Sequence, residues 1–458
     1  MCVLSLASCD GKKGSGGAPA PAGSAGPVSA AVSVSAREQP ARAVSSASAA
    51  NSPAPSVAPS SAPSSAVAAP GRPPASAKEA CQILKGPIQL SFTGAATVWP
   101  SEDGGPERDP HIVFNRDGIP KAVTLPAQAA VRADASARAP GSAAGSAAGS
   151  APGSASARAA LPERLALAEP AERATTPGCA IGGGSLFCMA QNGDIHRTTL
   201  SGDGDTVVAR GRPGTPVAAS TIGRGQVVYA FLADKKTSEG IVSQAFAAID
   251  DAAPATISED GSGATFITLA PRGEAVVAMY IDARRAMTPL HARVLHAEPG
   301  HLRAGNDAVL FVGEGSETRV AGALALGESG PTFGLLPGFK DTTTFGIAAI
   351  RIDETPKDDA PVTWSTYPSG MDRAAVAATR GSSPRRVLLS RPATNDPKSK
   401  KLLELGEIEE SGAFRGLCTV AEGSSFTDLG VTADRFGTLW LTYTDASGTW
   451  IERRGKAF

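Results

Sequence analysis

Two runs of seven consecutive apolar residues dominate the hydrophobic pattern of this chain. They are Val227–Ala233 and Ala275–Ile281, and each follows a glycine and one polar residue and ends at an aspartate. Successive side chains of a strand point to opposite faces, so a strand that is apolar at every position must be buried on both faces. The pattern therefore predicts two central strands covered on both sides.

The segments around these runs predict how the strands are covered. A parallel sheet would need a long amphipathic helix after each strand, and the sequence between the runs contains only short strand patterns and polar turns. The runs begin 48 positions apart, a spacing typical of four-stranded propeller blades. We therefore predict an all-β fold, a β-propeller of about six to seven blades. The alternatives are a β-sandwich or another β-barrel, in which one strand face would be wet and polar residues would alternate.

Composition divides the chain into a folded part and two low-complexity parts. Residues 10–77 are almost wholly Ser, Ala, Pro and Gly, which cannot bury enough apolar surface to offset their conformational entropy. We expect them to form a disordered tether that leads into a propeller spanning 78–458. A second Gly/Ser/Ala-rich stretch predicts a flexible insert at about 127–176.

Two short motifs resemble those of bacterial lipid-anchored β-propeller proteins. Leu6-Ala7-Ser8-Cys9 resembles the lipobox that precedes a lipidated cysteine, and Asp434 to Trp440 resembles the D-x-x-G-x-L-W repeat of propeller blades. The resemblance implies that residues 1–9 are the remainder of a signal peptide and that Cys9 carries a lipid. It also implies a membrane partner through that lipid and a location in the cell envelope. The sequence contains no apolar stretch long enough to span a membrane.

The cysteines predict two disulfides. If the turn in AIGGGSLF centres on Gly183-Gly184, Cys179 falls directly opposite Cys188 in a non-hydrogen-bonded pair. Cα atoms in such a pair are about 4.5 Å apart, which is within disulfide range. The alternative, a metal site, would need more ligands than the nearby His196. Cys81 and Cys418 form a second candidate pair.

The ends of the chain predict how the ring closes. The last unit offers two strands, TLWLTYT and GTWIERR, and a blade needs about four. Strands between Ile83 and Val98 are the nearest candidates to complete it. A bond between Cys81 and Cys418 would then fasten the closure.

Charge and motifs give little support for a particular chemistry. The net charge of −1 gives no electrostatic reason to expect nucleic acid as a partner. His291, His296 and His301 lie within eleven residues, but the first two are predicted to point to opposite faces of a strand, so we expect solvated histidines rather than metal ligands. The stretch Ser201–Thr206 could supply oxygen ligands to Ca²⁺, but it lacks the spacing of a calcium loop and predicts a turn. We find no nucleophile motif or phosphate loop, and therefore name no catalytic residue, metal or cofactor.

Two functions remain open from the sequence. The favoured one is a non-enzymatic binding scaffold at the cell envelope that takes a protein or glycan partner. The alternative is a propeller-type hydrolase or lactonase with scattered acidic residues and a metal in the central channel. The fold does not decide between them, because function depends on sites placed on the fold.

Overall fold

The computed structural model divides the chain into two units, Met1–Gly71 and Arg72–Phe458. The structure describes only part of the second unit. The described residues are 76–456 except for gaps of one to three residues and the longer gaps 100–108, 126–171, 284–288, 313–331, 368–374 and 379–385. The lipobox-like segment with Cys9 and the expected tether lie outside these residues, as does nearly all of the expected insert.

The described strands form seven antiparallel sheets, which we call blades 1 to 7 in chain order. The first four blades are made of the following strands: blade 1, β3 (Ala96–Trp99), β4 (His111–Arg116) and β5 (Ile119–Val123); blade 2, β7 (Ala180–Gly182), β8 (Ser185–Met189), β9 (Asp194–Thr198) and β10 (Thr206–Arg210); blade 3, β11 (Ala218–Ile222), β12 (Gln226–Thr237), β13 (Gly240–Ile249) and β14 (Ala255–Thr256); blade 4, β15 (Ala264–Arg272), β16 (Ala275–Asp282), β17 (Pro289–Glu298), β18 (His301–Ala304) and β19 (Ala308–Val312).

The remaining three blades continue in the same order, except that the last one takes its outer strand from the beginning of the chain. Their strands are: blade 5, β20 (Thr332–Phe339), β21 (Phe345–Ile352) and β22 (Val362–Tyr367); blade 6, β23 (Ala375–Ala378), β24 (Arg386–Pro392), β25 (Lys401–Ile408) and β26 (Phe414–Gly423); blade 7, β27 (Thr427–Ala433), β28 (Thr438–Asp445), β29 (Gly448–Lys456) and β1 (Ile83–Gln89). A short helix, α1 (Ala77–Cys81), precedes β1. A two-residue parallel pair, β2 (Phe92–Thr93) with β6 (Glu172–Arg173), lies beside blade 1.

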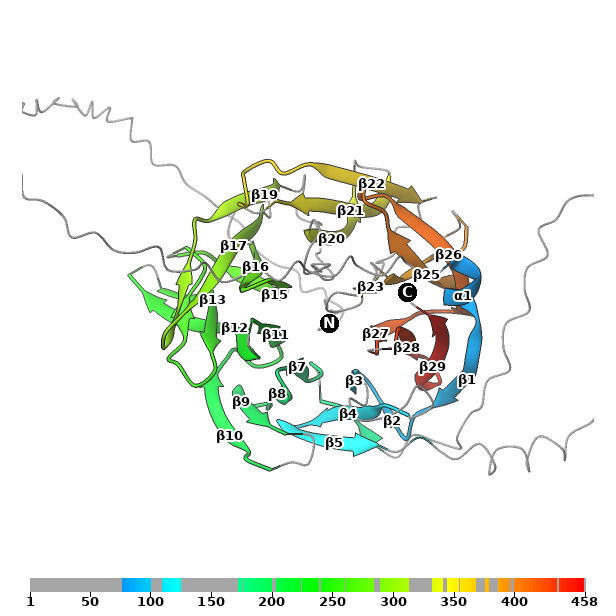
Figure 1. Cartoon of the computed structure of the whole chain (residues 1–458), viewed down its shortest axis with the longest axis horizontal. Helices are drawn as coiled ribbons and strands as arrows, with labels where there is room; N and C mark the ends of the chain where they lie inside the picture. Colours follow the sequence, from blue (N-terminus) through cyan, green and yellow to red (C-terminus); the bar gives the residue numbers. More distant parts are fainter. Residues whose placement is uncertain are drawn as a thin grey trace, which may run out of the picture. The chain divides into compact units, whose positions relative to one another are not determined.

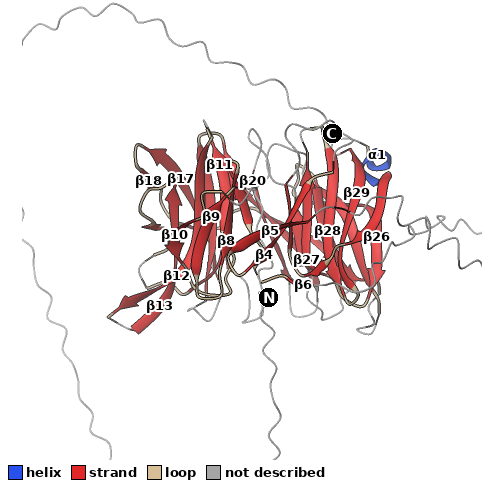
Figure 2. Cartoon of the chain, turned by 90° about the horizontal axis from the view of Figure 1, so that it is seen from below, coloured by secondary structure: helices blue, strands red, loops and turns tan. Residues whose placement is uncertain are grey.

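The blades are arranged around a common centre, so the predicted β-propeller is confirmed. Figure 1 shows β3, β7, β11, β15, β20, β23 and β27 as the innermost strands of their sheets. Seen from the side in Figure 2, the strands run from one face of the ring to the other. The blade number is seven, the upper value of the prediction.

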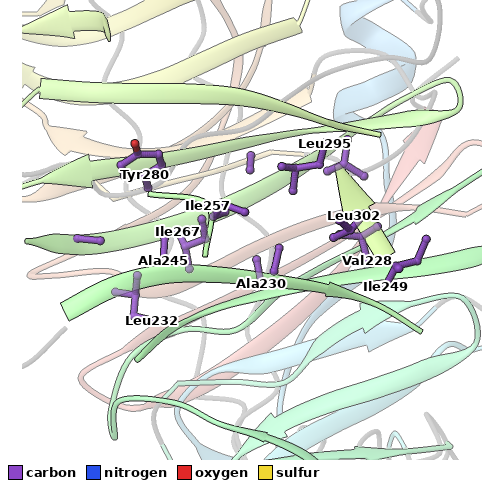
Figure 3. Packing of buried hydrophobic residues seen from close by; sticks show 14 of the residues in the cluster. Val228, Ala230, Leu232, Ala245, Ile249, Ile257, Ile267, Tyr280, Leu295 and Leu302 are labelled. Carbon is purple, nitrogen blue, oxygen red and sulfur yellow. The ribbon is translucent and has the colours of Figure 1, made fainter. Parts of the chain in front are cut away.

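The two apolar runs form equivalent strands, as their common pattern predicts. They are β12 and β16, each the second strand of its blade, and Val227–Leu232 and Ala275–Asp282 are buried at every position. Alternate residues of each strand therefore face opposite neighbouring blades. In Figure 3, Val228, Ala230 and Leu232 of blade 3 lie against a cluster that includes Tyr280 of blade 4.

Buried apolar side chains form seven clusters among the described residues, and each cluster joins two successive blades. One cluster contains Val228 and Val276 of blades 3 and 4, and the next contains Val277 and Leu336 of blades 4 and 5. The cluster that contains Trp440 joins blade 7 to Ile112 of blade 1. The apolar core is thus a closed series of interfaces, with no break between the last blade and the first.

The chain closes the ring much as the sequence predicts, with two corrections. β1 pairs with β29, and the disulfide Cys81–Cys418 is present. The final blade already has three strands from its own end of the chain, because the apolar-polar stretch before Asp434 forms β27. Only Ile83–Gln89 is therefore needed for closure, and Val98 lies instead in β3 of blade 1.

The predicted cysteine hairpin is confirmed in its register. Ala180 pairs with Phe187, and Gly183 and Gly184 form the turn with φ of 52° and 75°. Positive φ at both turn positions is the reason for two glycines there. Cys179 and Cys188 form the disulfide, with Cα atoms 4.4 Å apart.

The D-x-x-G-x-L-W stretch forms the turn between β27 and β28. The Asp434 carboxylate accepts backbone N–H groups of Phe436 and Thr438 at 2.9 and 2.8 Å, and Gly437 has φ of 81°. Leu439 and Trp440 then enter the core, where they are at most 2% exposed. The motif is therefore a blade-building element in this chain.

The end of the expected insert is more ordered than predicted. Glu172–Arg173 forms the short parallel pair with β2, and the next residue, Ala174, is 7% exposed. The buried Phe92 and Ala174 explain this order, since both belong to the cluster between blades 7 and 1. None of the helices in the described part of the chain is long and apolar enough to cross a membrane.

Candidate functional site

The strand that carries two of the predicted histidines contributes to a buried polar cluster in blade 4. His291 and His296 both lie on β17, and they point to opposite faces as expected. The expectation that both are solvated is wrong for His291, which is 2% exposed. His291 is buried because a carboxylate from the next strand connection reaches it.

That carboxylate belongs to Asp307, which three side chains of blade 4 contact. His291 Nδ1 lies 2.6 Å from Asp307 Oδ2, while Oδ1 accepts the Tyr280 hydroxyl at 2.8 Å and Arg293 Nε at 3.0 Å. The rings of Tyr280 and His291 stack with centroids 4.8 Å apart. We call these four residues the Asp307 cluster.

The topology of blade 4 explains how Asp307 reaches its partners. The outer edge of β17 pairs with two different strands: Leu295–Glu298 with β18 and Pro289–Ala292 with β19. Asp307 is the last of the three residues that connect β18 to β19. It therefore lies beside β17 at the point where pairing with β18 ends and pairing with β19 begins. Arg293 lies opposite this change, and its side chain is 19% exposed. The side chain of Arg293 is therefore more exposed than those of Asp307 and His291, which are 9% and 3% exposed.

The charges in the cluster fix its protonation. Burial opposes ionisation of Asp307, but the hydrogen bond and charge from His291 and the hydrogen bonds from Tyr280 and Arg293 outweigh it, so the pKa lies below its usual value. Burial, the Asp307 charge and the hydrogen bond to Asp307 raise the pKa of the Tyr280 hydroxyl well above its usual value. Asp307 is therefore an ionised acceptor and Tyr280 a neutral donor.

An ionised Asp307 also assigns the proton on His291. A carboxylate only accepts hydrogen bonds, so Nδ1 carries the proton and donates it to Oδ2. The charge of His291 acts on Asp307 when the ring is protonated, and when the ring is neutral Nε2 has a free lone pair. Nε2 is buried, and it has no hydrogen-bond partner among the residues that the structure describes.

Polar atoms of the neighbouring blade extend the Asp307 cluster. The backbone of Glu259 connects them, because it hydrogen-bonds to Tyr280 and its carbonyl accepts Gln244 Nε2 at 3.2 Å. Gln244 is fully buried, and its Oε1 has no partner within the described ranges. The Oγ atoms of Ser243 and Ser262 are also buried without a hydrogen-bond partner among the described residues. Buried polar atoms without partners are uncommon in folded proteins, so Nε2 of His291 and Oε1 of Gln244 mark a candidate site.

The innermost strands offer much less chemistry. Across the described residues of β3, β7, β11, β15, β20, β23 and β27, only Arg272 and Asp428 are charged. Arg272 donates to the backbone carbonyls of Ile352 and Asp353 and so joins two blades. These strands therefore hold no converging carboxylates or histidines in the described part of the chain.

The other sequence candidates are separate from the Asp307 cluster. Of the stretch Ser201–Thr206, the structure describes the last four residues, and Asp205 lies 3.0 Å from Nδ1 of His196. His301 is exposed and pairs with Glu298. No three His, Cys, Asp or Glu side chains within the described ranges are grouped so that they could hold a metal ion. The predicted disulfide cysteines are present as bonded pairs, and Cys9 is outside the described residues.

Sequence reasoning missed the Asp307 cluster, although a signal for it existed. In the apolar stretch of β17, His291 and Arg293 are two apart and so share one face of the strand. Two such residues in a buried strand require polar partners. Nothing in the sequence pointed to Asp307 as that partner, because it lies in an irregular connection 14 residues after Arg293.

Comparisons with known proteins find solved structures that are similar only at low sequence identity and low TM-score. No protein-family model and no curated protein matches the chain. An exo-1,5-alpha-L-arabinanase from a bovine ruminal metagenomic library matches with a TM-score of 0.31 and 10% identity over 52% of this chain and 91% of that one. An endo-arabinase from Bacteroides thetaiotaomicron matches with a TM-score of 0.32 and 12% identity over 50% of this chain and 89% of that one. A neuraminidase-like protein of A/little yellow-shouldered bat matches with a TM-score of 0.36 and 10% identity over 60% of this chain and 92% of that one.

These comparisons correct the function favoured from the sequence. A non-enzymatic scaffold was expected, whereas the similar propellers include an exo-arabinanase, an endo-arabinase and a GH43_1 enzyme from Xanthomonas citri. The findings agree better with the alternative, a propeller-type hydrolase. The expectation relied on the absence of a sequence motif, and a site built from dispersed residues leaves none. No substrate or catalytic residue of those enzymes is transferred to this chain.

Proposed function

We propose that this protein is a propeller-type hydrolase in which His291 acts as general base and then general acid. One observation carries the proposal: a buried His291 is held by an ionised Asp307 through Nδ1, while Nε2 has no partner in the described part of the chain. This is the arrangement by which a carboxylate orients an imidazole for proton transfer.

The chemistry follows from the two ring nitrogens. Nε2 removes a proton from a water molecule as its oxygen attacks the electrophilic carbon of the substrate. The departing group then takes the proton back from Nε2, so the histidine ends neutral. Asp307 stabilises the imidazolium formed in between, and Arg293 and Tyr280 keep the carboxylate ionised and in place. This step needs no metal ion, so the metal of the earlier alternative has no part in the proposal.

The position of the cluster supports small substrates. Nε2 is buried, and Arg293, which shares the Asp307 carboxylate with His291, is partly exposed. A small neutral ester or lactone fits such a site better than a polymer. A water molecule held on Nε2 would react there in surroundings of low dielectric, where the charge of Asp307 has a strong effect.

The test is hydrolysis of a panel of chromogenic esters, lactones and glycosides by the oxidised protein. His291→Asn keeps an N–H near the Nδ1 position for Asp307 and removes Nε2, so it should fold and lose about 10²–10⁴-fold in kcat/KM. His196→Asn is the matched control, because His196 pairs with Asp205 in blade 2 through the same ring atom. Unchanged rates in His291→Asn, or no hydrolysis of any substrate by the wild type, would overturn the proposal.

We also propose that the protein is exported and held at the cell envelope by a lipid on Cys9. The support is the pair of disulfides, since such bonds persist in oxidising compartments and are rare in the cytosol. The lipobox-like residues before Cys9 provide the attachment point, and the long Ser/Ala/Pro-rich segment would separate the propeller from the membrane.

A further inference from the structure

The start of the described chain is fixed to two blades by different kinds of bond. Ala80 of α1 is fully buried in the apolar cluster between blades 6 and 7. Cys81 is bonded to Cys418, which lies in the middle of β26 of blade 6. The next residues join blade 7, where the Gln82 carbonyl accepts the Gly455 N–H at 2.7 Å and β1 begins its ladder with β29.

The ladder that closes the ring is irregular. β1 lies at the edge of blade 7 and pairs with β29 only. Its register shifts twice, between Ile83 and Lys85 and between Lys85 and Ile88. Ile83 and Leu84 are 40% and 43% exposed, so the first half of β1 contributes little apolar burial. A pull on the N-terminal end would load these pairs one after another, beginning with Ile83.

The disulfide lies before this ladder along the chain. A force that arrives through residues ahead of α1 reaches Cys81 first and passes through the bond to Cys418. β26 is joined to β25 by a ladder of eight residue pairs, which also shifts register twice but is twice as long as the four-pair ladder of β1. The load therefore enters blade 6 through a covalent bond, and only part of it reaches β1.

We infer that α1 and the Cys81–Cys418 disulfide form a mechanical clasp that keeps the propeller closed when its N-terminal segment is pulled. The disulfide acts as the load-bearing connection, and β1 acts only as the closing strand. A folded ring can then be held by one end without opening at the ladder between β1 and β29. This inference is independent of the proposed hydrolase activity and of the identity of the anchor.

Single-molecule pulling tests the clasp. One handle is placed at the N-terminus and the other on an azide-bearing residue that replaces Ile241, which is 75% exposed in blade 3. In the double variant Cys81→Ala/Cys418→Ala, α1 and β1 should detach first, at low force, in a step of about 45 Å for residues 77–89. The oxidised wild type should lack this step.

A matched variant separates the clasp from general effects of losing a disulfide. Cys179→Ala/Cys188→Ala removes the bond within blade 2, which is not on the path of the load, and should leave the wild-type trace unchanged. In that background, adding a reductant during pulling opens Cys81–Cys418 without altering its residues and should produce the early step. An early step in the oxidised wild type, or the same first rupture with and without the bond, would overturn the inference.

Discussion

Tyr280 and His291 stand opposite each other on β16 and β17, and their stacked rings both hydrogen-bond to the Asp307 carboxylate. Tyr280 also belongs to the apolar cluster between blades 3 and 4. The polar site is thus built into a packing interface. Substitutions there should change both stability and reactivity, and the two effects can be measured separately.

Asp307→Asn should destabilise the fold. The amide removes the charge that pairs with Arg293 and places an N–H₂ group among three donors, so we expect a loss of about 2–4 kcal/mol in the free energy of unfolding, measured with urea. Asp205→Asn is the control, because the His196–Asp205 pair is half exposed at the carboxylate and should cost less than about 1 kcal/mol. Equal losses for the two variants would contradict the assigned role of Asp307.

The same carboxylate should make stability depend on acidity. The pKa of Asp307 is lowered in the folded protein, so its contribution is complete above the ordinary value of 3.8 and is lost as the pH falls through the lower folded value. The stability difference between wild type and Asp307→Asn should therefore shrink as the pH is lowered below about 4. Urea titrations at a series of pH values measure this difference, and a difference that grows towards low pH would contradict the assignment.

Tyr280 should produce the opposite dependence at high pH. Its pKa is raised by burial and by Asp307, so the folded state favours the neutral phenol. That contribution is complete below the ordinary value of 10.0 and is lost as the pH rises above it. Tyr280→Phe should lose less stability than the wild type between about pH 10 and 11, although it starts lower because it lacks the hydrogen bond to Asp307. Parallel losses in the two proteins would show that Tyr280 does not titrate with unfolding.

Removal of β1 should open the ring. A chain that begins at Leu90 lacks both the closing strand and Cys81, and it exposes the edge of β29. Cys81→Ser keeps β1 and loses only the bond, which closes a loop of 337 residues and is worth about 6 kcal/mol by chain entropy. Calorimetry should find the truncated chain less stable than Cys81→Ser. If the two unfold at the same temperature, β1 contributes nothing to closure.

Lipid attachment at Cys9 can be tested in cells. Labelled palmitate should enter the full-length protein and should not enter Cys9→Ser, because the hydroxyl cannot replace the thiol as the acceptor of the lipid. Cys2→Ser is the control, since Cys2 lies ahead of the expected cleavage position. Equal labelling of wild type and Cys9→Ser would disprove the anchor.

The sequence predicted those parts of the molecule that depend on neighbours along the chain. The apolar runs of β12 and β16, and the register that places Cys179 opposite Cys188, follow from local alternation and turn chemistry. The Asp307 cluster depends instead on where an irregular connection returns to the blade, which residue types alone do not specify. The closing strand β1 could be predicted only in part. Counting the strands of the last blade showed that an early strand must complete it, but did not show that this strand ends at Gln89.

The parallel pairing of β2 with β6 has a consequence for how this protein can vary. Leu125, which is 7% exposed, and Glu172, which pairs with Lys121, bring the two ends of the intervening chain to the side of blade 1. The ring therefore fixes where the two ends of that chain segment lie, but it does not fix the number of residues between them. For any flexible segment closed between two fixed ends, each doubling of its length costs only about 0.6 kcal/mol. Blade 1 is thus a natural acceptor position, where a lineage or a protein engineer can add an independently folding domain without altering any of the seven interfaces between blades.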